Sequence, residues 1–106
     1  MNDDKETELI ELAVNEGPQQ EASLRRLSDI GCFGITEQQE IVFRRLILEV
    51  VDGESQSEYW YEALVPYAAN KEFIDTLKER AESAVADVRR RAKVALVAIE
   101  LSGVDY

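Results

Sequence analysis

The sequence predicts an all-α protein with a single domain over residues 1–106, built from about six helices in three antiparallel hairpins. Two observations lead to this prediction. Apolar residues recur at the three- and four-residue spacing of amphipathic helices, and no segment shows the alternation that is typical of a strand. Turn signals separate the helical segments by no more than about six residues, so neighbouring helices must pack against each other. A compact bundle and a short superhelix of helix pairs both satisfy these constraints.

The most apolar stretch, Ile41–Val51, predicts a central helix over residues 36–52. Thr36 and Gln39 have the spacing of a capping box, and Asp52-Gly53 ends the apolar run. At 100° per residue the apolar side chains form one broad and one narrow stripe, which predicts packing on two sides. The broad stripe contains Val42, Phe43, Leu46, Ile47 and Val50, and the narrow one contains Ile41 and Leu48.

Two helices precede the central one. Residues 5–16 are amphipathic, and Gly17-Pro18 provides a glycine that ends one helix and a proline that begins the next, which extends to about Ile30. A turn over residues 31–34 follows, in which Cys32 is expected to be a small buried side chain.

Three helices follow the central one. Ser55 and Glu58 form a second capping-box pattern and predict the start of the fourth helix, which Pro66 should kink or shorten. Asn70 is the expected cap of a fifth helix, and a last helix over residues 84–102 is followed by Gly103, which stops it.

Part of the last two helices resembles a known repeat family. The run Asp87-Val88-Arg89-Arg90-Arg91-Ala92-Lys93-Val94-Ala95-Leu96 is similar to the second helix of a HEAT repeat, and Phe73–Ala81 stands where the first helix should be. The resemblance is good over residues 71–101 and poor over residues 6–31. It implies a short right-handed stack of helix pairs that binds other proteins, without catalysis. It also implies that Arg89 bridges to acidic groups of the neighbouring hairpin.

The charge balance indicates the kind of partner. The chain has 22 acidic and 12 basic residues, a net charge of −10. Such a field repels nucleic acids and anionic membranes, and it speeds encounter with basic proteins. A basic protein partner is therefore expected, with no direct nucleic acid contact and no membrane contact.

The chain lacks the residues of most catalytic and metal sites. It contains no histidine, and its one cysteine excludes an internal disulfide. The usual general base and the commonest transition-metal ligand are missing, so we expect no catalytic residues, no metal and no cofactor. The acidic segment Met1–Glu6 has no apolar leader, which predicts a cytoplasmic protein.

An acidic and aromatic segment is the candidate partner-binding site. Its residues are Glu49, Asp52, Glu54, Glu58, Tyr59, Trp60, Tyr61 and Glu62. Three successive aromatic side chains cannot all face the core from one helix, so at least one is expected on the surface, where it could anchor a cationic partner. In the alternative arrangement Trp60 faces inward while Tyr59 or Tyr61 covers a neighbouring helix.

Two other groups of charged residues are weaker candidates for a site. Arg89, Arg90, Arg91 and Lys93 are better explained as structural cations than as a nucleic-acid surface, and the carboxylates of residues 52–62 lack metal-site spacing. The leading hypothesis is an acidic inhibitor or immunity-type protein that masks the basic surface of a nuclease or toxin. The alternative is a structural or adaptor subunit that forms a homodimer through its apolar third and sixth helices.

Overall fold

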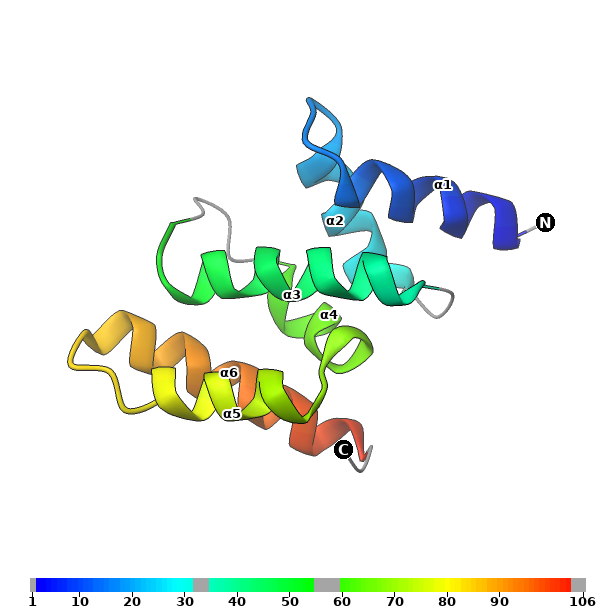
Figure 1. Ribbon diagram of the computed structural model, residues 1–106. Coiled ribbons are helices and arrows are strands. Elements are labelled where there is room, and N and C mark those ends of the chain that lie inside the picture. The colour runs from blue at the N-terminus through cyan, green and yellow to red at the C-terminus, as the bar shows by residue number, and fades with distance from the viewer. Residues whose placement is uncertain (1, 32–34, 55–59, 104–106) are drawn as a thin grey trace.

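The computed structural model describes residues 2–31, 35–54 and 60–103 of the chain. Within these ranges the backbone forms six helices and no strand, which confirms the predicted all-α fold (Figure 1). In chain order they are α1 (Asn2–Val14), α2 (Gln20–Ile30), α3 (Glu37–Val51), α4 (Tyr61–Ala68), α5 (Lys71–Arg80) and α6 (Ala86–Ser102). The expectations for Cys32 and for the capping pair Ser55 and Glu58 fall outside the described residues.

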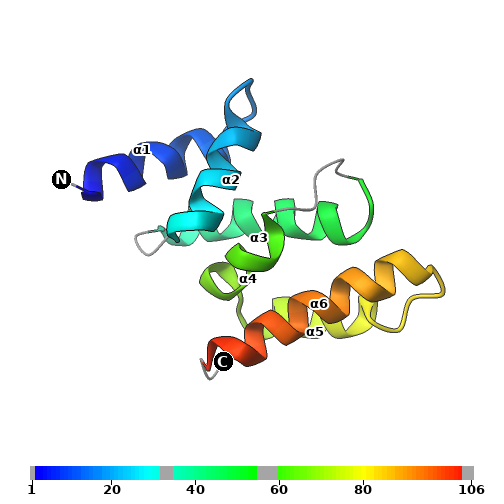
Figure 2. The ribbon, with the colours of Figure 1, turned by 180° about the vertical axis from the view of Figure 1, so that it is seen from behind.

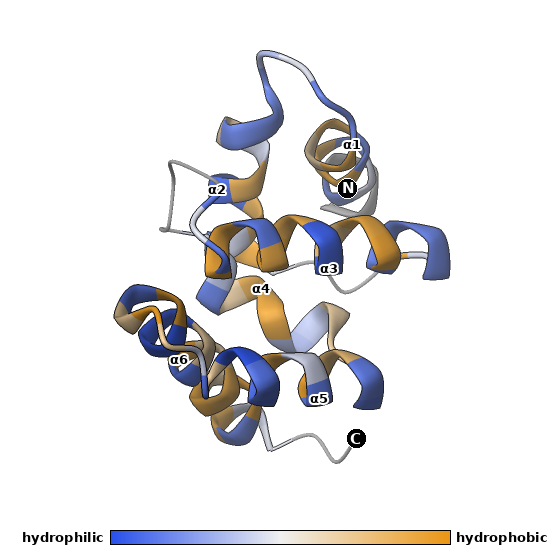
Figure 3. Cartoon of the chain, turned by 60° about the vertical axis from the view of Figure 1, so that its left-hand side comes forward, coloured by the Kyte–Doolittle hydropathy of each residue, from blue (hydrophilic) through white to orange (hydrophobic). Residues whose placement is uncertain are grey.

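Consecutive helices pack in pairs, α1 with α2, α3 with α4, and α5 with α6. The pairs are stacked one on another in a molecule that measures 44 × 31 × 22 Å (Figure 3). The second helices α2, α4 and α6 adjoin one another in that order, and α3 also contacts α1 and α6. In Figure 1 α5 lies in front of α6, whereas Figure 2, seen from behind, shows α6 in front. The helix α5 therefore lies on one face of the stack and α6 on the opposite face.

The middle hairpin supplies much of the hydrophobic core. Phe43, Ile47 and Val50 of α3 are fully buried, as are Leu64 and Val65 of α4. Complete burial of aliphatic and aromatic side chains is the main favourable term in folding. The predicted helix over residues 36–52 is thus observed as α3, and its main apolar side chains lie in the core.

The expected packing of α3 on two sides is only half correct. On its broad apolar stripe Phe43, Leu46, Ile47 and Val50 are buried and Val42 is partly buried. On the narrow stripe Ile41 is 57% exposed and Leu48 is only partly buried. The reason is that α5 packs mainly on α6 and does not cover this side of α3.

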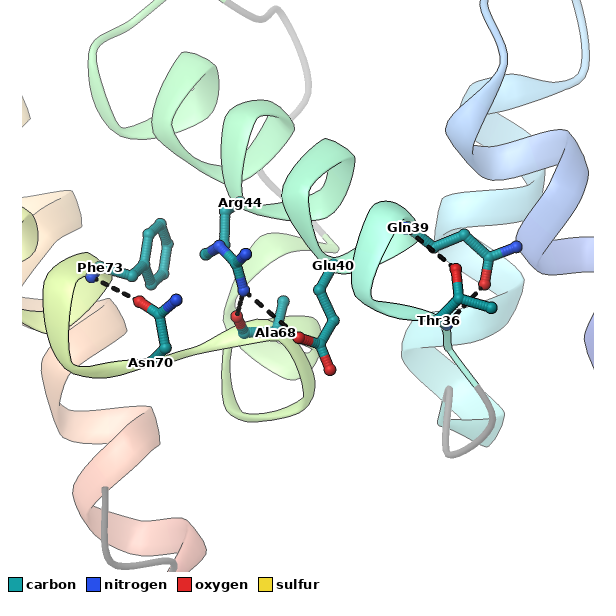
Figure 4. Close-up of polar contacts among 7 residues, drawn as sticks. All are labelled: Thr36, Gln39, Glu40, Arg44, Ala68, Asn70 and Phe73. Carbon is teal, nitrogen blue, oxygen red and sulfur yellow. Dashed lines mark hydrogen bonds and ion pairs between the residues drawn. The ribbon is translucent and has the colours of Figure 1, made fainter.

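Local capping signals set three of the helix ends. Thr36 and Gln39 form the predicted capping box, with Thr36 Oγ1 accepting from the Gln39 amide at 3.2 Å (Figure 4). Asn70 Oδ1 accepts from the Phe73 amide at 2.8 Å and caps α5. Gly103 ends α6 in the left-handed conformation, with φ = 72°. These bonds satisfy backbone groups that a helix end leaves without an intrahelical partner.

Arginine side chains link the second and third hairpins. Arg91 is 7% exposed and donates from Nε to the Val51 carbonyl at 3.0 Å, at the carboxyl end of α3. Nearby, Arg80 Nε and Asp52 Oδ1 form an ion pair at 2.8 Å. A cation at the carboxyl end of a helix interacts favourably with the carbonyls and with the helix dipole.

The role that the family resemblance implied for Arg89 is not observed. Arg89 Nη1 donates to the Ser83 carbonyl at 3.1 Å, within its own hairpin. The link to the neighbouring hairpin is made instead by Arg91, two residues later, and it ends on a backbone carbonyl. The reason is the rotation of α6, because a shift of two residues along a helix turns a side chain by about 200°.

We predict that Arg91→Ala lowers the free energy of unfolding by about 2–4 kcal/mol, because it removes a buried bond to the Val51 carbonyl and leaves a cavity. Urea denaturation followed by circular dichroism measures this change. Lys93→Ala, at an exposed position on the same helix, should change stability by less than about 0.5 kcal/mol. Equal effects of the two substitutions would show that Arg91 does not hold the hairpins together.

A second prediction concerns Gly53, which has φ = +83° and lies against Arg91, so that an added Cβ would stand 3.0 Å from Arg91 Nη2. Gly53→Ala should destabilise the protein through both backbone strain and this contact. Gly103→Ala is the matched control, because Gly103 has φ = +72° but nothing within 4 Å of the added Cβ. We expect the control to cost about 1–2 kcal/mol and Gly53→Ala to cost more. The same thermal or urea denaturation of both variants decides this, and an equal loss would contradict it.

Candidate functional site: an acidic groove between α3 and α5

A groove of about 570 Å³ runs between α3 and α5, along the side of α3 that α5 does not cover. Its lining residues are Ile41, Arg44, Arg45, Leu48, Glu49, Asp52, Glu54, Asn70, Glu72, Phe73 and Thr76. Those from α3 lie about one helical turn apart along the helix, so they form a continuous wall. The groove thus has the length of a helix and opens to solvent.

The apolar part of the groove comes from Ile41 and Leu48 on α3 and from Phe73 on α5. Ile41 is 57% exposed, while Phe73 is 4% exposed and belongs to the core. Ile41 and Leu48 are the narrow stripe of α3 that the sequence predicted to be packed. It is available to a partner because no helix covers it among the described residues.

Two of the charged groups along the groove are held by other parts of the protein. Arg44 Nη1 donates to the Ala68 carbonyl at 2.8 Å and contacts Glu40 Oε2 at 3.5 Å (Figure 4). Asp52 is paired with Arg80. These two charges are therefore engaged in fastening α3 to the third hairpin and to α4.

The other carboxylates of the groove are Glu49, Glu54 and Glu72, and none of them forms an ion pair within residues 2–31, 35–54 and 60–103. Glu54 and Glu72 are exposed and Glu49 is partly buried. Arg45, also exposed, lies four residues before Glu49 but does not pair with it. The available charge of the groove is therefore mainly negative and lies beside an apolar strip.

The structure divides the predicted site residues among three places. Glu49, Asp52 and Glu54 lie together in the groove. Glu62 lies on α4, where it lines hollows formed with α6. Glu58 and Tyr59 are outside the described residues. The six of these residues that the structure describes therefore do not form one surface.

Trp60 and Tyr61 are in the core, so neither is an exposed anchor, and Trp60 faces inward as in the alternative arrangement. Their exposed fractions are 3% and 4%. The prediction assumed one helix through all three aromatics, but α4 begins at Tyr61, and Trp60 precedes it. Trp60 is the N-cap of α4 with right-handed helical backbone angles, and α4 contacts α2, α3 and α6, so two successive side chains can both be buried.

Sequence reasoning missed Glu72 and the two arginines of the groove. Glu72 lies in the first turn of α5, two residues after the cap residue Asn70. It lines the groove only because α5 lies beside α3. No sequence spacing connects it with Glu49 or Glu54. Only the turn after α4, with Ala69 in extended conformation, brings the start of α5 back to α3.

The predicted basic group is also divided. Arg91 is buried and Arg89 is half-buried, each bonded to a backbone carbonyl, whereas Arg90 and Lys93 are exposed on the outer side of α6. The four cations therefore do not make one basic face that could follow a phosphate backbone.

Metal ligands do not converge in the part of the chain that the structure describes, since no group of three or more Cys, Asp or Glu is placed to hold an ion there. No helix among the described residues is long and apolar enough to cross a membrane. Comparison with protein-family models, with curated proteins and with solved structures finds no match for this chain.

Trp60 is the sole tryptophan, so its fluorescence reports directly on whether this side chain is buried. We predict that acrylamide quenches the native protein much more weakly than the urea-unfolded protein, because the native indole is buried. Steady-state quenching at matched protein concentrations measures this difference. Strong quenching in the native state would mean that Trp60 is on the surface after all.

Proposed function

We propose that this protein is a non-catalytic, acidic protein-binding module of the inhibitor or immunity type, which masks the basic surface of a partner such as a nuclease or toxin. The binding surface is the groove between α3 and α5. The observation that carries the proposal is the set of three carboxylates, Glu49, Glu54 and Glu72, that lack ion pairs in the described chain and lie beside exposed Ile41.

The net charge of −10 supports a basic partner, because electrostatic attraction raises the rate at which oppositely charged surfaces meet. Carboxylates that already have partners add little to such an encounter, since their charge is balanced locally. Glu49, Glu54 and Glu72 are different in this respect. Lysine and arginine side chains of the partner would provide the counter-charges that this chain does not.

The apolar strip supports a protein partner rather than a small cation. Ile41 and Leu48 offer area that a partner can remove from water, at about 25 cal/mol per Å² of apolar surface. Interfaces typically combine such an apolar centre with a charged rim. A basic side chain could lay its methylene groups on Ile41 and direct its charge to Glu49.

We also propose that the fold is a short HEAT-like superhelix, and that the protein is cytoplasmic. The three stacked helix pairs are compatible with the resemblance over residues 71–101, although the third hairpin is the part that carries its pattern. Members of that family bind proteins on extended surfaces made by successive helix pairs. A groove between the first helices of two pairs is a surface of this kind.

The triple variant Glu49→Gln, Glu54→Gln and Glu72→Gln should weaken partner binding about tenfold or more at low salt, because it removes the free charges of the groove without changing its shape. A partner captured from the source cells is purified, and its binding is measured by surface plasmon resonance over a range of salt concentrations. Native binding should weaken as salt rises.

The matched control is Glu8→Gln, Glu11→Gln and Glu16→Gln, which changes the net charge equally at three exposed positions near α1. Its effect should be smaller than that of the groove variant, since it alters only the long-range field. Equal effects of the two variants would assign binding to total charge and not to the groove. An acidic partner, or binding that is indifferent to salt, would contradict the proposal outright.

A further inference from the structure

The outer face of α4 and α6, away from the groove, is apolar and exposed. It is made by Ala63, Pro66, Val94, Val97, Ala98 and Leu101, which line two adjoining hollows of about 420 and 450 Å³. Leu101 is 81% exposed and Val97 is 49% exposed. We call these six residues the outer face. They share no residue with the groove between α3 and α5.

The outer face is a second apolar stripe on α6. The first stripe, Val88, Ala92, Ala95 and Ile99, is buried against the rest of the protein. Val97 stands about 180° from Val88 around the helix, and Leu101 is close to Val97 on the same side. Val97 and Leu101 are therefore exposed to water on the side of α6 opposite the core, whereas Val94 is partly buried against the core.

Charges of both signs border the outer face. Glu62 of α4 lines the larger hollow together with Arg90 and Lys93 of α6. Glu62 and Lys93 do not pair with each other, and neither forms an ion pair elsewhere in the described part of the chain. Within the described residues, one carboxylate and one ammonium group on this apolar surface thus have no counter-charge.

We propose that the outer face binds a second copy of this chain, in a two-fold dimer where α4 and α6 of one protomer meet α4 and α6 of its partner. A basic protein would place like charges against Arg90 and Lys93, and an acidic one would place them against Glu62. In a two-fold dimer each contact between two different residues occurs twice, so Glu62 of each protomer can meet Lys93 of the other. In the same dimer the partner protomer covers Val97 and Leu101.

The size of the surface indicates a weak, reversible dimer. The outer stripe of α6 from Arg90 to Leu101 is about 17 Å long at 1.5 Å per residue. This length limits the area buried by two such surfaces to at most the low end of specific interfaces, about 1,200 Å² in total. Because each chain carries a charge of −10, the protomers repel each other at long range, and added salt should strengthen association by screening this repulsion.

Sedimentation equilibrium of the full chain, at protein concentrations up to about 500 µM, tests this proposal in about 20 mM and about 500 mM salt. We expect a monomer–dimer equilibrium that becomes at least severalfold tighter at the higher salt concentration. The variant with Val97→Gln and Leu101→Gln should remain monomeric. The control variant, Ile30→Gln with Val85→Gln, changes two exposed apolar side chains elsewhere and should dimerise like the native chain. A native chain that stays monomeric throughout, or a Val97/Leu101 variant that dimerises normally, overturns the proposal.

Exchange of the two charges tests the two-fold arrangement itself. Glu62→Lys alone and Lys93→Glu alone should each weaken the dimer about two- to tenfold, whereas the double variant should recover the native dissociation constant. Recovery supports contact between Glu62 and Lys93 across the axis, and additive losses overturn it. The proposal does not depend on the proposed function, because the dimer should tighten with salt while binding of a basic partner should weaken.

Discussion

The stack depends most on a charged side chain that is buried where the second and third hairpins meet. An arginine keeps its proton under all ordinary conditions, so a buried guanidinium must keep its acceptors in place. Arg91 has the Val51 carbonyl as acceptor at the end of α3, and the left-handed turn at Gly53 leaves room for the guanidinium. The position of α6 on α3 is thereby specified by polar geometry in addition to apolar packing, which by itself would allow α6 to slide.

This junction explains why the molecule has a groove on one side. Arg91 and the ion pair between Arg80 and Asp52 fasten the third hairpin at the carboxyl end of α3. Arg44 holds the end of α4 near the middle of α3. Between these attachments α5 packs on α6, and the narrow apolar stripe of α3 stays open. The exposure of Ile41 is therefore a consequence of how the hairpins are joined.

Features that depend on neighbours in the chain could be predicted from the sequence, and features that depend on packing could not. The Thr36 capping box, the Asn70 cap and the stop at Gly103 are local and were predicted. The sequence left open whether Trp60 faces the core, because its burial depends on where α4 begins and on which helices surround that end. Arg91 was not distinguished from Arg89, because the pattern does not give the rotation of α6 against α3. Of the candidate site, Glu49, Asp52 and Glu54 were found, but Glu72 belongs to the groove only through tertiary structure.

Net charge and local charge have separate roles in this molecule. The total of −10 acts over distances of about a Debye length, roughly 8–10 Å at ordinary salt, and decides which partners approach. At contact the nearest side chains decide where a partner binds. The groove has four carboxylates against two guanidinium groups, whereas the hollow between α4 and α6 has one carboxylate against two cations. A basic protein attracted by the whole chain is therefore directed to the groove and disfavoured at the outer face, which remains open to a surface with charges of both signs.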